Sequence, residues 1–319
     1  MNRIRKIFYS PIIFFIAVCV FLLPNLAVAK NIDKVVELPV IKNHGDVDDS
    51  FERYLRTLPI KTGNYKSRKP PILISGAMNV EISDLVHALK NPVMYKDMNY
   101  IYIAGTYKDY PIVISRTEQN EANSAGSAAL AIKKFKPVAI INQGTAGAHV
   151  DDLHLNDIVI GESTIDYTAI KTAYRAKGEG ADLTDQEMRG TFAYDKKTDT
   201  FQLNERYFAD PTLLKISQSV ADIHKEFNAV SGTISTADAW ITNIDYINFL
   251  HEKYGSSCAE METSCAAQIC QNAGVPFIGI RVLSDTILVS GVYNPDVAQT
   301  TQKFVLLVAE KYISDVLKK

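Results

Sequence analysis

The sequence predicts an α/β fold, a three-layer αβα sandwich around a central mixed, largely parallel β-sheet. From residue 71 onward, short apolar segments of strand length alternate with longer amphipathic segments of helical period. Residues 138–142 and 277–283 are almost entirely apolar, as expected for strands of a sheet that is covered on both faces. The composition, 47% hydrophobic and 22% charged over 319 residues, is typical of a globular chain.

The predicted strands are runs of apolar and β-branched residues bounded by turn residues. They lie at residues 72–75, 101–104, 112–115, 138–142, 158–161, 230–235, 257–261 and 277–283. The predicted helices have apolar residues at three- and four-residue spacing. They lie at residues 81–90, 122–135, 211–227, 245–254, 262–272 and 301–317. Pro137 stops the second helix, Gly274 is expected to end the fifth, and a glycine-containing turn, residues 144–147, follows the strand at 138–142.

Two segments fall outside this alternation. Residues 30–70 are mixed and polar in character, and we expect them to form an N-terminal extension that wraps the domain or stays partly mobile. Residues 170–210 are polar and irregular, which predicts a long surface excursion of the kind that often serves as a lid or binding loop. The single predicted catalytic domain is therefore residues 71–319.

The first 29 residues have the pattern of a signal peptide. Residues 3–6 hold three positive charges, residues 12–23 are an almost unbroken apolar run, and Ala27-Val28-Ala29 offers small residues to a signal peptidase. The run is shorter than the ~20 residues of a spanning helix, which disfavours a permanent membrane anchor. We expect cleavage after Ala29, an exported protein, periplasmic or secreted, and no stable membrane span in the mature chain.

Charge and cysteine content exclude several classes of partner. Removing residues 1–29 lowers the 34 basic residues to 31 against 36 acidic ones, a formal charge of −5. A mildly acidic chain without a basic block has no electrostatic footprint for nucleic acid. Cys258, Cys265 and Cys270 are odd in number and lack CxxC spacing, so we expect free, buried thiols. The six histidines are scattered, and no metal or cofactor is predicted.

Polar residues follow four of the predicted strands, where ligands bind in folds of this class. They are Gly76-Ala77-Met78 with Glu81, the segment 142–147, the segment 259–262, and Ser284-Asp285. One carboxylate at a strand end is usually only solvated. Four such ends on one edge of a sheet predict a binding or catalytic site.

These residues also carry a resemblance. Residues from about 71 to 315 resemble the nucleoside phosphorylase/nucleosidase superfamily and, within it, the 5′-methylthioadenosine/S-adenosylhomocysteine nucleosidases. The matching stretches are ILISGAMNVEI, VAIINQGTAGAHVDDLHLNDIVIGE, TADAW and AEMETSCAAQICQNAGVPFIGIRVLSD, in the family's order. The resemblance implies hydrolysis of the N-glycosidic bond of a purine nucleoside, with release of adenine and the ribosyl product, by a homodimer.

Two carboxylates match the family's catalytic residues. Breaking the C1′–N9 bond requires a proton for the departing purine, a stabilised ribosyl cation and an attacking water. Asp285 matches the general acid at N7, and Glu81 matches the carboxylate that orients and deprotonates the water. The structural alternatives are a strand-end cap for Asp285 and a favourable helix-dipole position for Glu81.

Other residues match the substrate-binding set. Glu262 matches the residue that holds the ribose hydroxyls, Met261 would pack against the sugar, and Trp240 of TADAW would stack on the purine unless it belongs to the core. Arg281 would pair with the carboxylates or form a plain buried ion pair, and Glu260 could be structural. The remaining predicted substrate-binding residues are Met78, Thr145, Gly147 and Ser284.

Two other functions remain open at this stage. A purine nucleoside phosphorylase would need an anion site, for which Arg116 is available, but Glu118, Glu121 and Glu81 would repel phosphate. An exported storage protein would have no need of Asp285, Glu262 and Glu81, whereas an exported protein that only binds nucleosides stays open. The sequence departs from the family pattern at residues 115–121 and 165–167, which leaves the preferred 5′-substituent open.

Overall fold

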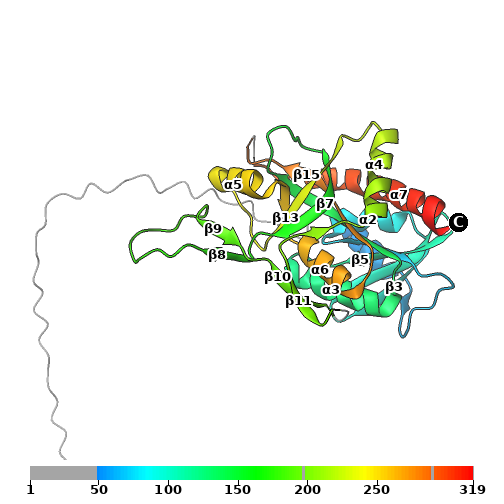
Figure 1. Ribbon diagram of the computed structural model, residues 1–319. Coiled ribbons are helices and arrows are strands. Elements are labelled where there is room, and N and C mark those ends of the chain that lie inside the picture. Colours follow the sequence, from blue (N-terminus) through cyan, green and yellow to red (C-terminus); the bar gives the residue numbers. More distant parts are fainter. Residues whose placement is uncertain (1–48, 196–197, 289–290, 319) are drawn as a thin grey trace, which may run out of the picture. The chain divides into compact units, whose positions relative to one another are not determined.

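The computed structural model describes residues 49–195, 198–288 and 291–318. The predicted signal peptide and the first part of the predicted extension lie outside these residues. The described part has the three-layer α/β architecture that the sequence predicts, with one large mixed sheet between two sets of helices (Figure 1).

The large sheet has strands in the order β1-β3-β4-β5-β2-β6-β14-β13-β7-β12, and β15 pairs with both β6 and β7. Their bounds are β1 Ile60–Lys61, β2 Ile72–Gly76, β3 Lys90–Asp97, β4 Tyr100–Tyr107, β5 Tyr110–Arg116, β6 Ala139–Ala148, β7 Ile158–Asp166, β12 Tyr207–Phe208, β13 Ala229–Thr236, β14 Ser256–Glu260 and β15 Phe277–Asp285. Six of the pairings are parallel and five antiparallel, so the prediction of a mixed sheet is confirmed.

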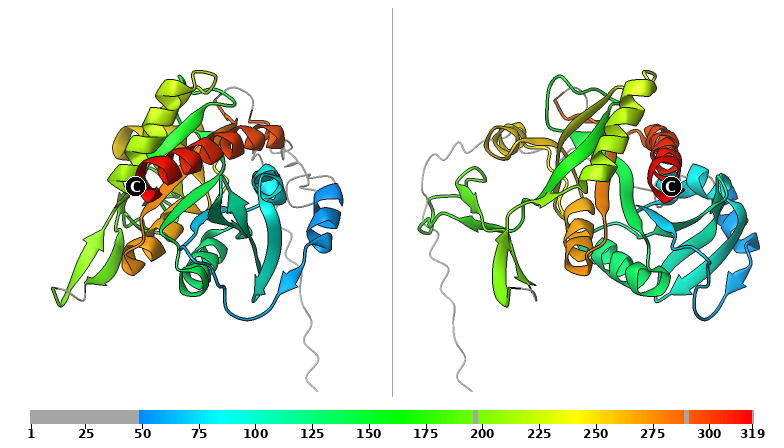
Figure 2. Two further views of the ribbon diagram at one scale, coloured as in Figure 1. Left: turned by 90° about the vertical axis from the view of Figure 1, so that its right-hand side faces the viewer. Right: turned by 45° about the vertical axis from the view of Figure 1, so that its right-hand side comes forward.

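Helices cover both faces of this sheet. The helices are α1 Asp49–Thr57, α2 Asn79–His87, α3 Glu121–Phe135, α4 Pro211–Ile223, α5 Ile244–Tyr254, α6 Thr263–Ala273 and α7 Ala298–Tyr312, the last continuing into a π-helical turn Ile313–Leu317. Helices α1, α2, α4 and α7 pack on one face, and α3 and α6 pack against each other on the opposite face (Figure 2). No helix in the described part of the chain is both long and apolar enough to cross a membrane.

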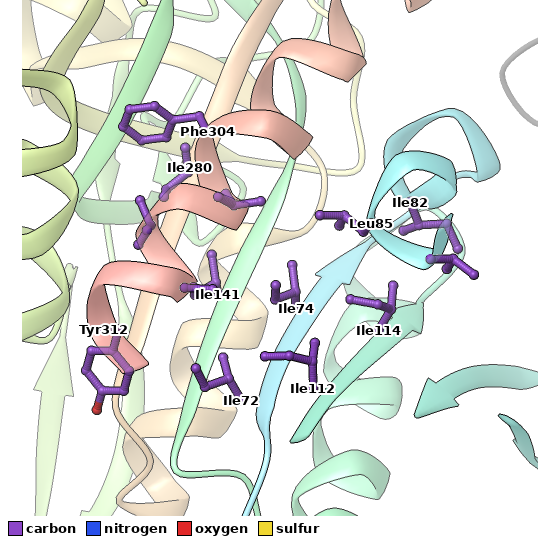
Figure 3. Close-up of a cluster of buried hydrophobic side chains, with 14 of the residues drawn as sticks. Ile72, Ile74, Ile82, Leu85, Ile112, Ile114, Ile141, Ile280, Phe304 and Tyr312 are labelled. Atoms are coloured by element: carbon purple, nitrogen blue, oxygen red, sulfur yellow. The ribbon is translucent and has the colours of Figure 1, made fainter. Parts of the chain in front are cut away.

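The core explains why the strands are apolar at consecutive positions. Ile72 and Ile74 of β2 point toward α2 and α7, together with Ile114 and Ile141 of neighbouring strands (Figure 3). Leu73, between them, points to the opposite face and packs in the cluster beneath α3 and α6. Because strand side chains alternate between faces, a sheet buried on both faces requires apolar residues at every position.

Residues 49–61 of the predicted extension pack against this domain. Phe51, Leu55 and Leu58 are buried in the main core cluster, and β1 pairs in parallel with β3. Arg116 at the end of β5 binds Glu52 of α1, with 2.7 Å between Nη1 and Oε1. Apolar burial and one ion pair therefore fix this part of the segment on the domain.

Strand β6 is the element that most affects the site. The structure corrects the prediction of a glycine turn at residues 144–147, because these residues continue the strand to Ala148. β15 pairs in parallel with one edge of β6, and β14 pairs in antiparallel at residues 147–148. Strands β6, β14, β13, β7 and β15 thus form a closed path of hydrogen-bonded pairs. The end of β6 is held between the ends of β14 and β15.

Three further expectations are corrected. The helix predicted at 81–90 is shorter, because β3 begins at Lys90. Strand β3 itself was not predicted. The excursion at residues 170–210 is also less irregular than expected, since it contains two antiparallel hairpins, β8 (Ile170–Thr172) with β9 (Gln186–Met188) and β10 (Thr191–Asp195) with β11 (Thr200–Asn204).

Candidate active site

An open cavity with an empty volume of about 880 Å³ lies where β2, β6, β14 and β15 end. Ten of the eleven predicted site residues line it, namely Met78, Glu81, Thr145, Gly147, Trp240, Glu260, Met261, Glu262, Ser284 and Asp285. Their convergence follows from the topology, because β14 and β15 flank the end of β6 and β2 runs beside it.

Glu81 is buried and fully hydrogen-bonded. Its Oε2 accepts from the backbone N–H groups of Ala77 and Met78 at 2.8 and 3.1 Å. Its Oε1 accepts from the N–H and the hydroxyl of Thr145 at 2.8 and 3.1 Å. Because Glu81 stands in the first turn of α2, the helix dipole also favours its negative charge. The surroundings therefore hold an oriented carboxylate at one end of the cavity.

A glycine in β6 makes room for this carboxylate. A Cβ atom on Gly144 would lie 2.6 Å from Glu81 Oε1, closer than two such atoms can approach. We expect Gly144→Ala to displace the carboxylate and lower kcat/KM by up to about 10²-fold, since small misplacements of catalytic groups have effects of this size. Steady-state kinetics with a purine nucleoside would measure the loss. Gly126→Ala, which crowds only the Tyr100 hydroxyl away from the cavity, is the control, and equal activity in both variants would contradict the prediction.

Asp285 stands at the end of β15 opposite Gly147. Its Oδ1 accepts a hydrogen bond from the Ser284 hydroxyl at 2.9 Å, and a Cβ on Gly147 would lie 3.1 Å from its Oδ2. Burial raises the pKa of the Asp285 carboxyl above its ordinary value, and the Ser284 hydrogen bond only partly opposes this. A carboxyl in such surroundings is suited to hold a proton and donate it.

Glu262 and Glu260 are adjacent in the cavity wall but have different surroundings. Glu262 Oε1 accepts from the N–H of Asn120 at 3.1 Å, and its Oε2 accepts from Met261 N–H at 3.3 Å. Burial, and then the nearby charge of Glu260, raise the pKa of Glu262 well above its ordinary value, while Arg281 lowers it. Glu260 instead binds Arg281, the Thr236 hydroxyl at 2.6 Å and two backbone N–H groups at the start of α6.

Arg281 forms a buried ion pair with a cavity carboxylate, an arrangement that the sequence analysis left open. This side chain is 1% exposed and is not among the residues that line the cavity. It binds Glu260 through Nε and Nη2, and its Nη2 donates to Asn142 Oδ1 at 2.6 Å, whereas Glu262 Oε2 is 3.9 Å away. Arg281 therefore supports the cavity wall from behind as a positioning residue.

Trp240 is placed at the cavity mouth and not in the core. It is 47% exposed, lines the cavity and contacts the Tyr293 ring edge-to-face with centroids 6.1 Å apart. Met78, Met261 and Ile287 add further apolar surface to the lining. A flat apolar ligand could lie between these side chains while its polar edges reach the carboxylates.

Sequence reasoning missed three polar or aromatic lining residues, Gln119, His149 and Tyr293. His149 follows directly on β6, in a stretch whose glycines alone attract notice in the sequence. His149 could have been predicted to line the cavity from its position two residues beyond Gly147, because alternate residues of a strand point to the same face.

An acidic cluster lies near the cavity at the start of α3. Burial, followed by the charges of Asp166, Asp238 and Glu260, raises the pKa of Glu121 to about 7.

The folded state therefore holds the proton of Glu121 more tightly than the unfolded chain does, so the stability contribution of Glu121 falls as pH rises from about 4.5 through about 7. We expect Glu121→Gln to remove this fall, so that the variant gains stability over the unmodified protein at about pH 8 and not at about pH 4. Urea unfolding at both pH values, with the exposed Glu252→Gln as control, would measure this, and parallel pH profiles would contradict it.

Metal binding has no support in the described part of the chain, where no group of three or more His, Cys, Asp or Glu side chains is arranged to hold an ion. Cys258 and Cys270 are buried free thiols, and Cys265 is partly buried and also free.

Comparison with known proteins identifies the family. The family model described as the phosphorylase superfamily matches residues 71–315. The 5′-methylthioadenosine/S-adenosylhomocysteine nucleosidase of Shewanella frigidimarina is 30% identical over 213 residues, which are 66% of this chain and 84% of the relative. The enzyme of the same name from Geobacillus sp. is 28% identical over 215 residues, 67% of this chain and 84% of the relative.

Solved structures share the fold. The nucleosidase from Neisseria meningitidis in complex with methylthio-immucillin-A superposes with a TM-score of 0.62 at 20% identity, covering 76% of this chain and 99% of that one. The futalosine hydrolase of Helicobacter pylori gives the same TM-score and identity, covering 76% and 97%.

Proposed function

The chain belongs to the phosphorylase superfamily, and from this premise we propose that it is a purine nucleosidase that hydrolyses the N-glycosidic bond of substrates such as 5′-methylthioadenosine or S-adenosylhomocysteine. The observation that carries the proposal is the presence of three carboxyl groups with different surroundings around one cavity. Glu81 accepts four hydrogen bonds, whereas burial raises the pKa of Asp285 and of Glu262.

Each group suits one part of the reaction. Protonated Asp285 donates to N7 as electrons from the C1′–N9 bond move into the purine, so that the base leaves neutral. Glu262 binds the ribose hydroxyls, and its carboxyl oxygens stabilise the positive charge that develops on the sugar. Glu81, held with Thr145, orients the water and takes its proton when the oxygen bonds to C1′. The products are the free base and the free sugar.

The ion pairs that Arg116 already makes favour hydrolysis over phosphorolysis. Its Nη1 lies 2.7 Å from Glu52 and 2.8 Å from Asn79 Oδ1, and its Nε lies 2.9 Å from Glu118. Two carboxylates thus already neutralise this guanidinium, which is not among the cavity-lining residues. An anion site would need an available cation, and Glu81 at the cavity end would repel phosphate.

Product analysis tests the proposal. The mature protein is incubated with 5′-methylthioadenosine, S-adenosylhomocysteine, adenosine and inosine, each with and without phosphate. We expect free base and free sugar at equal rates in both conditions. Base released only with phosphate would identify a phosphorylase, and no base in either condition would favour a non-catalytic binding protein.

We also propose that the protein is exported after cleavage following Ala29. The support is the charged start, apolar run and Ala27-Val28-Ala29 site in the sequence. Intact-mass measurement of the protein purified from cells would give the mature N-terminus. A chain that keeps its first 29 residues in the membrane fraction would contradict the proposal.

We further propose a homodimer. Its support is an apolar face on the β10–β11 hairpin, where Phe192 pairs with Leu203 and Tyr194 pairs with Phe201 in register. All four side chains are about half to three-quarters exposed, which is unusual for adjacent large apolar groups. Light scattering during size-exclusion chromatography would test it, and a monomer at micromolar concentration would contradict it.

A further inference from the structure

His149 is a buried imidazole in the cavity wall that the proposed reaction does not use. It follows the last residue of β6, and its backbone N–H donates to Ser257 O at 3.0 Å, which continues the pairing with β14. Of the described residues that line the cavity, it is the only histidine. Its side chain is almost fully enclosed, with 4% of the residue exposed.

The hydrogen bonds of two serines determine which ring nitrogen carries the proton. The Ser235 hydroxyl donates to Ser256 Oγ at 2.7 Å. Ser256 Oγ lies 2.8 Å from His149 Nδ1 and 3.4 Å from Cys258 O. The Ser256 hydroxyl therefore makes the shorter hydrogen bond when it donates its proton to Nδ1. Nδ1 then accepts, and the neutral ring carries its proton on Nε2. Burial, and then the neighbouring His251, lower the pKa of His149 to about 4, which keeps the ring neutral at physiological pH.

The order of residues along β6 locates this donor relative to the reacting groups. Thr145 contacts Glu81, Gly147 stands opposite Asp285, and His149 is two residues further along. At about 3.3 Å per residue, His149 lies roughly 7 Å beyond Gly147, on the side away from Glu81. With the sugar at Glu81 and N7 at Asp285, the six-membered ring of the base extends toward His149.

We propose that His149 is a base-recognition residue whose Nε2–H donates a hydrogen bond to a ring nitrogen of the six-membered ring of the purine. The inference rests on the proposed function for the placement of sugar and base. Adenine offers unprotonated N1 and N3 as acceptors, whereas the N1 of a 6-oxopurine carries a hydrogen. A base without the acceptor nitrogen would leave the buried Nε2–H of His149 unpaired, and the site therefore binds such a base more weakly.

Base binding measures this contact without the chemistry of bond cleavage. Calorimetry with adenine, 1-deazaadenine and 3-deazaadenine compares bases that differ by one ring nitrogen. For the unmodified protein, we expect one of the two deaza bases to bind about 3- to 12-fold more weakly than adenine, the range of one net hydrogen bond. His149→Phe and His149→Leu should bind all three bases with nearly equal affinity, and His149→Gln, which keeps a donor, should restore part of the difference.

The experiment separates the two proposals. Equal binding of all three bases to the unmodified protein, or the same preference in the Phe and Leu variants, would overturn the role of His149 even if the protein cleaves nucleosides. Loss of cleavage in the product assay would overturn the nucleosidase, whatever the base affinities. The exposed His154→Phe is the matched control and should keep the full preference of the unmodified protein.

Discussion

Replacing Asp285 with Asn is expected to lower kcat by about 10²- to 10⁴-fold, the usual contribution of a general acid. The amide keeps the size of the side chain and can still donate a hydrogen bond to N7, but it cannot transfer a proton as the bond breaks. In the unmodified protein, kcat/KM should fall as pH rises through the raised pKa of Asp285, since the acid must be protonated in the free enzyme. Steady-state kinetics across the pH range would show both effects.

Stability measurements distinguish this role from a structural one. Burial raises the Asp285 pKa, so the folded state binds the proton more tightly than the unfolded chain. The stability contribution of Asp285 therefore falls as pH rises through the folded-state pKa, and the Asp285→Asn variant would lack that fall. We expect the variant to be at least as stable as the unmodified protein at neutral pH. Full turnover in Asp285→Asn, or equal loss in the exposed control Asp296→Asn, would contradict the assignment.

Replacing Arg281 with Met should produce the largest loss of stability, about 3–5 kcal/mol in the free energy of unfolding. The guanidinium is the cation that the structure places against Glu260 and near Glu262, and all three side chains are buried. Met fills a similar volume but leaves two carboxylates in a poorly solvated wall without that cation. Activity should fall as well, because the pKa of Glu262 would rise further once Arg281 no longer opposes it.

Urea unfolding measures this prediction, with two controls. Glu260→Gln combined with Arg281→Met should recover part of the loss, because the double variant no longer leaves Glu260 charged and unpaired. Lys225→Met removes one partner of the exposed Asp222 pair and should change stability by less than about 0.5 kcal/mol. A similarly small loss in Arg281→Met would show that the buried pair does not stabilise the fold.

Most of the residues at the cavity could be predicted because the ends of strands can be recognised in the sequence. Glu81, Glu262 and Asp285 each follow an apolar run, and the topology of an α/β sheet brings such ends together. Arg281 could not be placed in the same way. It pairs with Gly144, but a register shift between Leu283 and Asp285 places Asp285 opposite Gly147, so the two side chains point to different faces. The sequence carries no signal for that bulge.

Long-range pairing explains the other differences. The glycine-rich end of β6 has a turn composition, yet it stays extended because β14 and β15 pair with it on both edges. β3 contains Pro92 and a left-handed Asn91, and its pairing with β4 and β1 holds it in the sheet. The β10–β11 hairpin is a different case, since Phe192 and Tyr194 alternate with smaller residues in a segment that is polar overall.

The family model begins at residue 71, but residues 49–61 also belong to the folded domain. Helix α1 supplies Phe51 and Leu55 to the main core and Glu52 to Arg116, so the homology boundary passes through a region of continuous packing. Domain boundaries drawn from family alignments mark what relatives share and not what one chain needs to fold. A chain trimmed to the shared region would expose apolar surface and remove one of the two carboxylates that neutralise Arg116. Here residues 49–61, which precede the family model, belong to both the core and the charge balance of the domain.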